Sequence, residues 1–501
     1  MAISPRLEKV TFQKCSQVTN KNKVECKLGV YEEDLQILCS NASACLTNAE
    51  ILDGEIRYSG KAVFNAVSCD NNELKNYESG VEFSFKFSSG VKGSSQALNV
   101  ASVELRDVDV VKQNGVLLAT ATVIFNAEAC YEEEIEQVPI TSIDFLTKKQ
   151  NLEKCDKIAK VEKSFNLQDD FLVDYVVSGV VCHTEKVFLT SSQCGIGTVI
   201  YDGEVEVSII FKTKQEANSV ACQTRRIPFR FESELGDVMP SHIALSTACV
   251  NGSNVKIYVD EAKNKSTVNI DVSLLLCSVV YETSSYGYCV DAYSTTNNLK
   301  LETAKKTLET ITEINCKEQK IVSDLAYFDE NAGLICLLND KIEEVETTFK
   351  DGTLFVKGIT SVSMLLNEGG QLKCQTSLVP FEANFIADCD SVKNVTCIVN
   401  GVAIERVDQK FTCSFTLIVG YACVSQKTAT VLIRVEEGEK KPQNNSAISV
   451  YVASKGEDLW DVCKALNASE EVILSSNMDL VFPLEKEERI LIYRELSKEE
   501  A

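Results

Sequence analysis

Three evenly spaced Asp-Gly pairs constrain the fold of this chain more than any other feature. Asp53-Gly54, Asp202-Gly203 and Asp351-Gly352 each stand between strand-like runs, and successive pairs are 149 residues apart. An Asp-Gly pair in that setting is the sequence signal of a two-residue β-hairpin, because both central residues of the turn need positive φ. The spacing therefore predicts three copies of one β-rich unit.

Phenylalanine and Asn-Gly residues provide further markers of the repeat. A phenylalanine follows each aspartate by 30, 27 and 30 residues, at Phe83, Phe229 and Phe381. Asn251-Gly252 and Asn400-Gly401 each lie 49 residues after their aspartate, and the first copy lacks this marker. We interpret these pairs as turns rather than metal ligands, and we expect Asn114-Gly115 to close another hairpin.

Between the markers, apolar and polar residues alternate, as in "STVNIDVSLLL" at 266–276. Val, Ile, Thr and Phe in period-two alternation are typical of half-buried strands. Before residue 447, only 299–314 suggests helical periodicity. The predicted fold class is mostly β, with three tandem sandwich-like or barrel-like domains followed by a small α+β domain.

The expected domain boundaries follow from these patterns. The three β domains are placed at 1–140, 155–290 and 305–436, with soft joints near 132–157 and 286–302. A polar, aperiodic stretch at 437–447 contains Pro442 and Gly438 and is interpreted as a linker. The last domain is placed at 448–494.

Charge and hydropathy exclude several classes of partner. The 501 residues carry a formal net charge of −23, and no basic run is longer than a pair, as in Arg225-Arg226. Binding to nucleic acid or to an anionic membrane needs clustered Lys and Arg, so neither is expected. No apolar run approaches the ~20 residues of a membrane span, and the first residues lack a secretory signal pattern. We expect a cytoplasmic protein.

The 21 cysteines include no CxxC pair, and several stand inside strand-like runs, for example Cys277, Cys336 and Cys413. A buried free cysteine behaves as a small apolar residue, and a reducing compartment disfavours a disulfide framework. Free thiols are therefore expected. Whether some of them later cross-link is left open.

Catalytic chemistry is not indicated by the residues present. His183 and His242 are the only histidines, and no nucleophile elbow, phosphate loop or metal-ligand spacing occurs. The acidic pair Glu343-Glu344 is too isolated to indicate general acid–base catalysis. We expect no enzyme, and therefore no catalytic residue, metal or cofactor.

The C-terminal segment predicts strand, helix, helix and strand within about 50 residues. "SVYVAS" is a short strand, and the spacing of Leu459, Val462, Cys463 and Leu466 gives a helix one apolar stripe. A second helix is expected to begin near Ser469 and to end at Asn477. "RILIYR" is the closing strand.

This segment resembles a LysM domain. The family pattern of Gly, acidic residue, Thr, Leu and Trp appears as Gly456-Glu457-Asp458-Leu459-Trp460, with its Asn at Asn477. Asp458 replaces the usual Thr, and Tyr493 replaces a Pro that often follows the last strand. The resemblance implies ligand binding between two loops, at Gly456, Glu457, Asp458 and Leu459 on one side and Asn477, Met478 and Asp479 on the other.

Two interpretations of Trp460, the only tryptophan, stay open. Its ring lies about 100° off the apolar stripe of the helix. It can pack against the second helix with only an edge in water, or it can belong to a recognition face for a ligand.

Repeated β units joined by a polar linker to a C-terminal LysM domain resemble the SPOCS (spore-coat-associated) proteins of endospore-forming Firmicutes. That resemblance implies a non-enzymatic coat morphogenesis scaffold in the mother cell, recruited to the forespore, whose LysM domain binds a coat morphogenetic ATPase. Other coat proteins are further implied partners, and the oligomeric state stays open.

Two alternative functions remain. The first is a wall or cortex protein that binds peptidoglycan through N-acetylglucosamine, which is the usual ligand of LysM domains. The acidic C-terminal segment and the lack of an export signal favour protein binding over it. The second alternative is a hydrolase whose catalytic unit lies within a β domain, which the two histidines disfavour.

Overall fold

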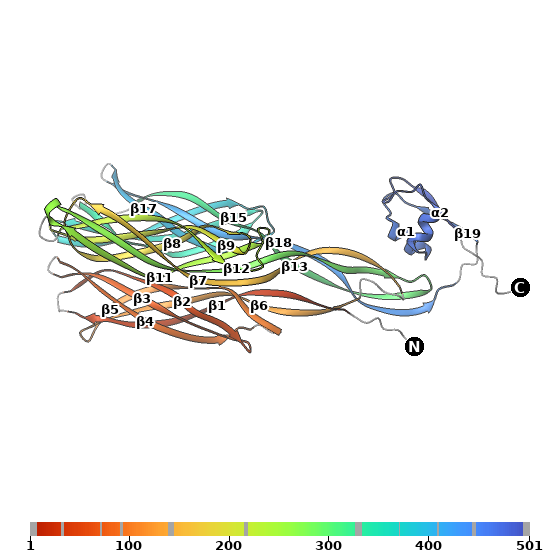
Figure 1. The fold of residues 1–501 in the computed structure, drawn as a ribbon, viewed down its shortest axis with the longest axis horizontal. Coiled ribbons are helices and arrows are strands. Elements are labelled where there is room, and N and C mark those ends of the chain that lie inside the picture. Colours follow the sequence, from red (N-terminus) through yellow and green to blue (C-terminus); the bar gives the residue numbers. More distant parts are fainter. Residues whose placement is uncertain are drawn as a thin grey trace.

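The computed structural model describes residues 8–31, 35–70, 73–90, 94–138, 145–214, 219–325, 333–369, 371–407, 410–442 and 447–493. Within these residues the chain is mostly β, with two short helices near the C-terminal end (Figure 1). Within these residues, neither helix has the length and hydropathy that a membrane crossing needs. The chain start, the linker centre at 443–446 and residue 494 lie outside the described part.

The first six strands form two three-stranded antiparallel sheets, ordered β1-β6-β5 and β2-β3-β4. We call this set the first unit. Its strands are β1 (Glu8–Val30), β2 (Gln36–Leu52), β3 (Glu55–Asp70), β4 (Glu73–Ser88), β5 (Ser94–Gln113) and β6 (Val116–Gln137).

The second unit repeats this order, as β7-β12-β11 and β8-β9-β10. A short 3-10 turn, η1 (Glu261–Lys263), connects its last two strands. The strands are β7 (Leu146–Val173), β8 (Val177–Cys194), β9 (Thr198–Thr213), β10 (Val220–Glu234), β11 (Ile243–Asp260) and β12 (Lys265–Tyr293).

The third unit repeats it again, as β13-β18-β17 and β14-β15-β16. The helix suggested at 299–314 is wrong, because these residues lie in β13 and pair with β18, interrupted by a bulge at Thr312. The strands are β13 (Asn297–Leu325), β14 (Gly333–Lys350), β15 (Thr353–Glu368), β16 (Gln371–Ile386), β17 (Ser391–Val407) and β18 (Lys410–Lys440).

Each unit has its own core between its two sheets. The alternation read from the sequence produces it: in β12, Val268, Ile270, Val272 and Leu274 are fully buried, while the residues between them are not. Successive side chains of a strand point to opposite faces, so one face of every sheet is apolar. The two apolar faces pack together and exclude water.

The Asp-Gly prediction is confirmed at two of its three positions. Asp53-Gly54 and Asp351-Gly352 have positive φ and close the β2–β3 and β14–β15 hairpins. Asn114-Gly115 does the same between β5 and β6. Asp202-Gly203 is not a turn, since it lies inside β9. The hairpin that precedes β9 turns instead at Gly197, which has φ +70°.

The phenylalanine markers show which glycines are structurally equivalent in the three units. Gly60, Gly203 and Gly358 each lie in the middle strand of a sheet, directly opposite Phe83, Phe229 and Phe381, respectively. In all three, a Cβ on the glycine would collide with the phenylalanine ring and with a backbone carbonyl of the other neighbouring strand. Each ring therefore lies over a bare glycine backbone, which explains a glycine inside a strand.

The later Asn-Gly pairs are bulges rather than hairpin turns. The ladder between β11 and β12 shifts register beside Gly252, and that between β17 and β18 shifts between Asn400 and Ala403. Gly401 has φ +64°, and its backbone N–H donates to a carboxylate oxygen of Glu206 in β9 at 3.0 Å. A bulge bends a strand and re-aims its backbone, and here it joins the third unit to the second.

The three units close into a ring. β4 contacts β8, β10 contacts β14, and β16 contacts β2, so each unit touches the next and the third returns to the first. Val67, Ile210 and Leu365 meet in one buried cluster, and each lies seven residues after the glycine of its unit. A repeated head-to-tail contact that returns to its start produces closed symmetry. Figure 1 shows the units side by side with their strands along the long axis.

The expected joints are strands rather than soft linkers. β7 pairs with β12 as far as Leu146↔Tyr293, and β13 pairs with β18 as far as Asn297↔Lys440. These two ribbons extend from the sandwiches and pack on each other through two apolar clusters. Of the first expected joint, 146–157 lies in β7 and 132–137 in β6, while 139–144 lies outside the described part. Most of 286–302 lies in β12 and β13, and 437–440 of the expected linker belongs to β18.

The C-terminal module consists of β19 (Ile448–Ala453), α1 (Leu459–Leu466), α2 (Glu470–Ser476) and β20 (Glu488–Tyr493). The predicted order of strand, helix, helix and strand is confirmed. β19 and β20 are antiparallel, with Ile448 opposite Tyr493. The module lies at the end of the molecule where the two ribbons end (Figure 1).

Candidate functional site

Asp458 is the N-cap residue of helix α1. The Asp458 carboxylate accepts a hydrogen bond from the backbone N–H of Asp461 at 2.8 Å, which satisfies a donor in the first turn. Val462 and Cys463 are fully buried, and Leu459 and Leu466 pack at the edge of the same cluster. The predicted apolar stripe therefore forms the core of the module.

The loop before α1 is occupied by contacts within the module. Gly456 has φ +91°, and its N–H donates to the Leu484 carbonyl at 2.8 Å. The Glu457 carboxylate accepts hydrogen bonds from the Tyr451 hydroxyl at 3.1 Å and from the Ser454 N–H at 3.2 Å. The Glu457 N–H donates to the Ser454 carbonyl, and the Glu457 carbonyl accepts from the Leu484 N–H. These predicted ligand residues therefore hold the loop in place.

Trp460 contacts the β body rather than open solvent. The residue is 8% exposed, and its Nε1–H donates to the Asp291 carboxylate at 2.9 Å. The ring of Tyr293 meets the indole edge-to-face, with centroids 4.9 Å apart, and the Tyr293 hydroxyl donates to the Ala468 carbonyl at 2.7 Å. Both partners belong to the tip of β12. The indole is thus buried at the boundary between the module and the ribbons.

Ion pairs extend this contact between the module and the ribbons. Lys148 of β7 lies 2.6 Å from the second carboxylate oxygen of Asp458, and Lys464 lies 2.7 Å from the Asp291 carboxylate. Burial by itself raises the pKa of Asp458, but the hydrogen bonds from Lys148 and from the Asp461 backbone, together with the charge of Lys148, outweigh burial, so the pKa lies below its usual value. Lys441, just beyond β18, bonds to Asn467. The contact between the module and the ribbons therefore consists of ion pairs beside the packed rings of Trp460 and Tyr293.

The second predicted loop divides into a structural residue and two exposed ones. The Asn477 side chain donates to the carbonyls of Ile473 and Leu491 at 2.8 and 2.7 Å, and accepts from the Leu491 N–H at 2.9 Å. It therefore joins α2 to β20. Met478 is 86% exposed, and Asp479 is also exposed. Of the predicted residues, these two and Gly456 are exposed to solvent.

The module also exposes an apolar sheet face that sequence reasoning did not single out. Val450 is 58% exposed, and Ile448, Val452 and Tyr493 on the same face of the β19–β20 sheet are exposed to a similar degree. Leu491, opposite Val450, is partly exposed, and the exposed Arg489 stands opposite Val452 at the edge of this face. Val481, beyond α2, is 79% exposed. We define the outer face as the four exposed residues Ile448, Val450, Val452 and Tyr493. The alternation of β19 contains this signal, because Ile448, Val450 and Val452 fall on the face opposite the module core.

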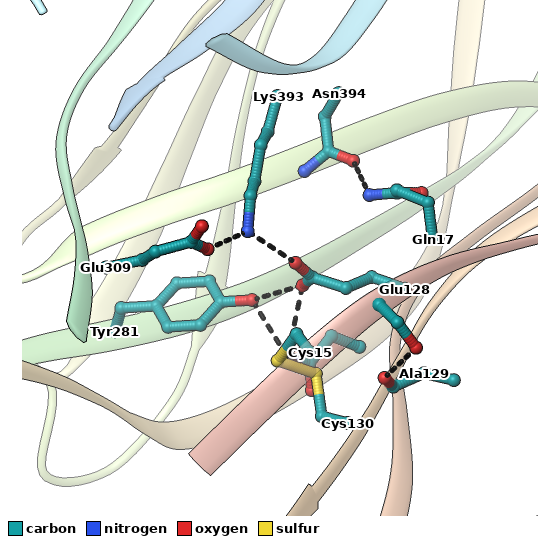
Figure 2. Close-up of a disulfide and its surroundings, with 11 residues drawn as sticks. Cys15, Gln17, Glu128, Ala129, Cys130, Tyr281, Glu309, Lys393 and Asn394 are labelled. Atoms are coloured by element: carbon teal, nitrogen blue, oxygen red, sulfur yellow. Dashed lines mark hydrogen bonds and ion pairs between the residues drawn. A yellow bond between two sulfur atoms is a disulfide. The ribbon is translucent and has the colours of Figure 1, made fainter. Parts of the chain in front are cut away.

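A second candidate lies where the three units meet, around a cavity of about 610 Å³. Figure 2 shows Glu128 of β6 between Tyr281 of β12 and Lys393 of β17. The Tyr281 hydroxyl donates to Glu128 at 3.3 Å and accepts from the Asn99 amide at 3.0 Å, while Lys393 pairs with Glu309 and lies 3.9 Å from Glu128. Burial and the negative charge of Glu128 raise the pKa of Tyr281. This network joins all three units.

A disulfide lies beside this network and corrects the expectation of free thiols throughout. Cys15 and Cys130 stand directly opposite each other on β1 and β6 and are bonded (Figure 2). Their separation of 115 residues hides the pairing, which only the strand register reveals. The other cysteines of the described part carry free thiols, many of them buried.

One group among the described residues has the spacing of metal ligands. The sulfurs of Cys15 and Cys130 and a carboxylate oxygen of Glu128 lie within 4.8 Å of one another. Both sulfurs are bonded to each other, and a soft metal needs thiolates. The group therefore offers a single carboxylate, and we assign it no metal.

No family model, curated protein or solved structure matches this chain. The candidate site is therefore interpreted from its own geometry. Sequence reasoning found α1 and the residues around Trp460. It missed Lys148, Asp291 and Tyr293, because these lie far from Trp460 along the chain and only the ribbons bring them together.

Proposed function

We propose that this protein is a non-enzymatic scaffold whose C-terminal module binds a partner protein through its outer face. The observation that carries the proposal is the exposed apolar sheet of the module, at Ile448, Val450, Val452 and Tyr493. Contiguous exposed apolar side chains mark interaction sites on soluble proteins. Met478 extends the exposed apolar surface of the module on the loop after α2.

The family resemblance supplies the setting of this proposal. We assign the three units as SPOCS-like domains and the module as a LysM domain. Two observations support the assignment: one strand order recurs three times, and the module has strand, helix, helix and strand in sequence. The resemblance then implies coat morphogenesis, with recruitment from the mother-cell cytoplasm to the forespore, and a coat morphogenetic ATPase as the partner. Other coat proteins would bind the β units.

The part of the module surface that is exposed favours protein binding over glycan binding. The loop and indole that a glycan would contact are occupied by Leu484, Asp291 and Tyr293. The outer face is mainly aliphatic, and the polar groups that it offers to sugar hydroxyls are the Tyr493 hydroxyl and Arg489 at its edge. The core of a protein interface, by contrast, is apolar and poor in charge. The module therefore suits a protein surface better than a polysaccharide.

The decisive test uses the full chain and the purified coat ATPase. A charge in the centre of an apolar interface is left desolvated, so Val450→Lys should weaken binding at least tenfold. Lys455→Ala, on the exposed loop of the same module, is the matched control and should bind like the wild-type chain. Titration calorimetry measures both, and circular dichroism confirms that each variant is folded.

Three outcomes would contradict the proposal. Equal ATPase affinity for Val450→Lys and wild type would remove the outer face as the binding surface. Capture of the full chain by purified peptidoglycan, with no affinity for the ATPase, would establish the wall-binding alternative instead. Release of soluble wall fragments by the pure protein would show that it is an enzyme.

A further inference from the structure

Two thiols meet across the boundary between the first and second units. Cys45 lies in β2 and Cys249 in β11, and their sulfurs are 3.3 Å apart. A disulfide bond measures about 2.05 Å, so the sulfurs need to approach by only about 1.3 Å. Cys45 is buried, and Cys249 is partly exposed. No other covalent connection spans this boundary in the described residues besides the chain itself.

A cavity of about 240 Å³ gives a small molecule access to this pair. Its walls come from both units: Ala44 and Val103 on the side of the first, and Cys249, Leu275 and Cys277 on the side of the second. Cys249 therefore faces open space, while Cys45 lies behind it. An oxidant in the cavity therefore reaches Cys249 first, and Cys45 can then complete the disulfide.

We propose that Cys45 and Cys249 form a disulfide that joins the first two units covalently. This modification goes beyond the scaffold function and does not depend on which partner the module binds. The oxidant is a small-molecule disulfide. The Cys249 thiolate attacks one sulfur of that molecule, forming a mixed disulfide and releasing one thiol. The Cys45 thiolate then attacks the Cys249 sulfur and releases the second thiol.

The exchange is balanced in atoms and electrons. Two protein thiols and one small disulfide give one protein disulfide and two small thiols, so the protein is oxidised by two electrons and the reagent is reduced by two. The new bond links residues 204 positions apart. A cross-link over so long a loop restricts the unfolded chain strongly and should raise the unfolding temperature of the oxidised protein.

The test follows the bond directly in the full chain. The protein is reduced, freed of reductant, treated with bis(2-hydroxyethyl) disulfide under nitrogen, and quenched with N-ethylmaleimide. Trypsin then yields peptide 28–57, which holds Cys39 and Cys45, and peptide 231–256, which holds Cys249 alone. We expect a linked species two hydrogens lighter than the two thiol peptides together, and a higher unfolding temperature.

Matched variants identify the sulfurs. Cys45→Ser and Cys249→Ser should abolish the link, whereas Cys39→Ser, in the same tryptic peptide, and Cys277→Ser, in the same cavity, should retain it. Recovery of Cys45 and Cys249 as alkylated thiols or as mixed disulfides, while the Cys15–Cys130 link re-forms in the same sample, would overturn the proposal. A link that involves Cys39 or Cys277 instead would overturn it as well.

Discussion

At the scale of single residues, a bare glycine under a phenylalanine ring defines each repeat of this protein. A Cβ on Gly203 would lie 2.5 Å from the Phe229 ring and 2.5 Å from the Phe188 carbonyl oxygen. Neither neighbour has room to retreat, because one is backbone and the other is packed in the core. Close packing therefore requires the glycine at 203. The preceding Asp202 makes the pair look like a turn in the sequence, but no turn forms there.

Gly203→Ala tests this packing. The added methyl has to displace the ring or the strand, so we expect a loss of about 1–3 kcal/mol in the free energy of unfolding. Gly179→Ala is the control, because a Cβ at that position in β8 meets nothing within 4 Å. Urea denaturation measures both variants. Equal stability of the two variants would show that the Phe229 ring over Gly203 does not constrain the glycine backbone.

His183 gives the stability of the molecule a pH dependence. Burial lowers its pKa, but the hydrogen bond with Glu185 and the charges of Glu185 and Glu78 raise the pKa by more than burial lowers it. The net pKa therefore lies above the usual value. A raised folded-state pKa stabilises the protein below the unfolded-state value of about 6.5, and the stabilisation is lost as the pH rises through the folded-state value. Stability from this residue should therefore fall as the pH rises above about 6.5.

An NMR titration of the His183 ring checks that prediction. Glu185→Gln removes the negative partner while keeping the size of the side chain, so the pKa of His183 should fall relative to the wild-type protein. The difference in unfolding free energy between pH 6 and pH 8 should shrink in the same variant. An unchanged pKa in Glu185→Gln would mean that the carboxylate does not stabilise the imidazolium.

At the scale of elements, short helices depend on side-chain contacts outside themselves. α2 (Glu470–Ser476) has seven residues, and isolated helices of that length are unstable in water. Asn477 compensates for this with three hydrogen bonds that join the end of α2 to β20. The asparagine that the family pattern marks as part of a ligand loop is therefore a structural residue in this chain.

Asn477→Ala should destabilise the module by about 2 kcal/mol, because it leaves backbone groups of Ile473 and Leu491 without their partner. Hydrogen exchange should accelerate in α2 and β20 and stay unchanged in the β units. Met478→Ala, next to it and exposed, should change stability by less than about 0.5 kcal/mol. Similar exchange rates in the two variants would contradict the structural role of Asn477.

At the scale of the whole molecule, contacts distant in sequence hold the module on the β body. Asp291 accepts from Trp460 and from Lys464, and Lys148 pairs with Asp458. The two ribbons that carry these residues pack on each other, so the contact is built on an ordered base. The position of the outer face relative to the β units follows from this contact.

Asp291→Ala removes the acceptor of the indole N–H and the partner of Lys464. We expect Trp460 to become hydrated and its fluorescence maximum to move to longer wavelength, a signal free of interference because the chain has one tryptophan. Asp479→Ala removes an exposed carboxylate from the same module and should leave the spectrum unchanged. An unshifted spectrum in Asp291→Ala would show that this contact does not hold the module in solution.

The sequence alone determined the local features, because they depend on neighbours along the chain. Period-two alternation predicted the strands, the Asp53-Gly54 and Asp351-Gly352 pairs predicted their turns, and the 459–466 stripe predicted a helix. Those signals arise from backbone sterics and from one-sided burial, and both act over a few residues. Where the local signal was ambiguous, at 299–314, pairing with β18 decided for a strand.

Only the tertiary structure decided the pairing of distant groups. It closed the three units into a ring, bonded Cys15 to Cys130, placed Cys45 against Cys249, and buried Trp460 against Asp291. Each of these joins residues more than 100 positions apart, where spacing along the chain carries no information about distance in space. Burial of the apolar strand faces fixes the register of the sheets, and the register then determines which side chains meet.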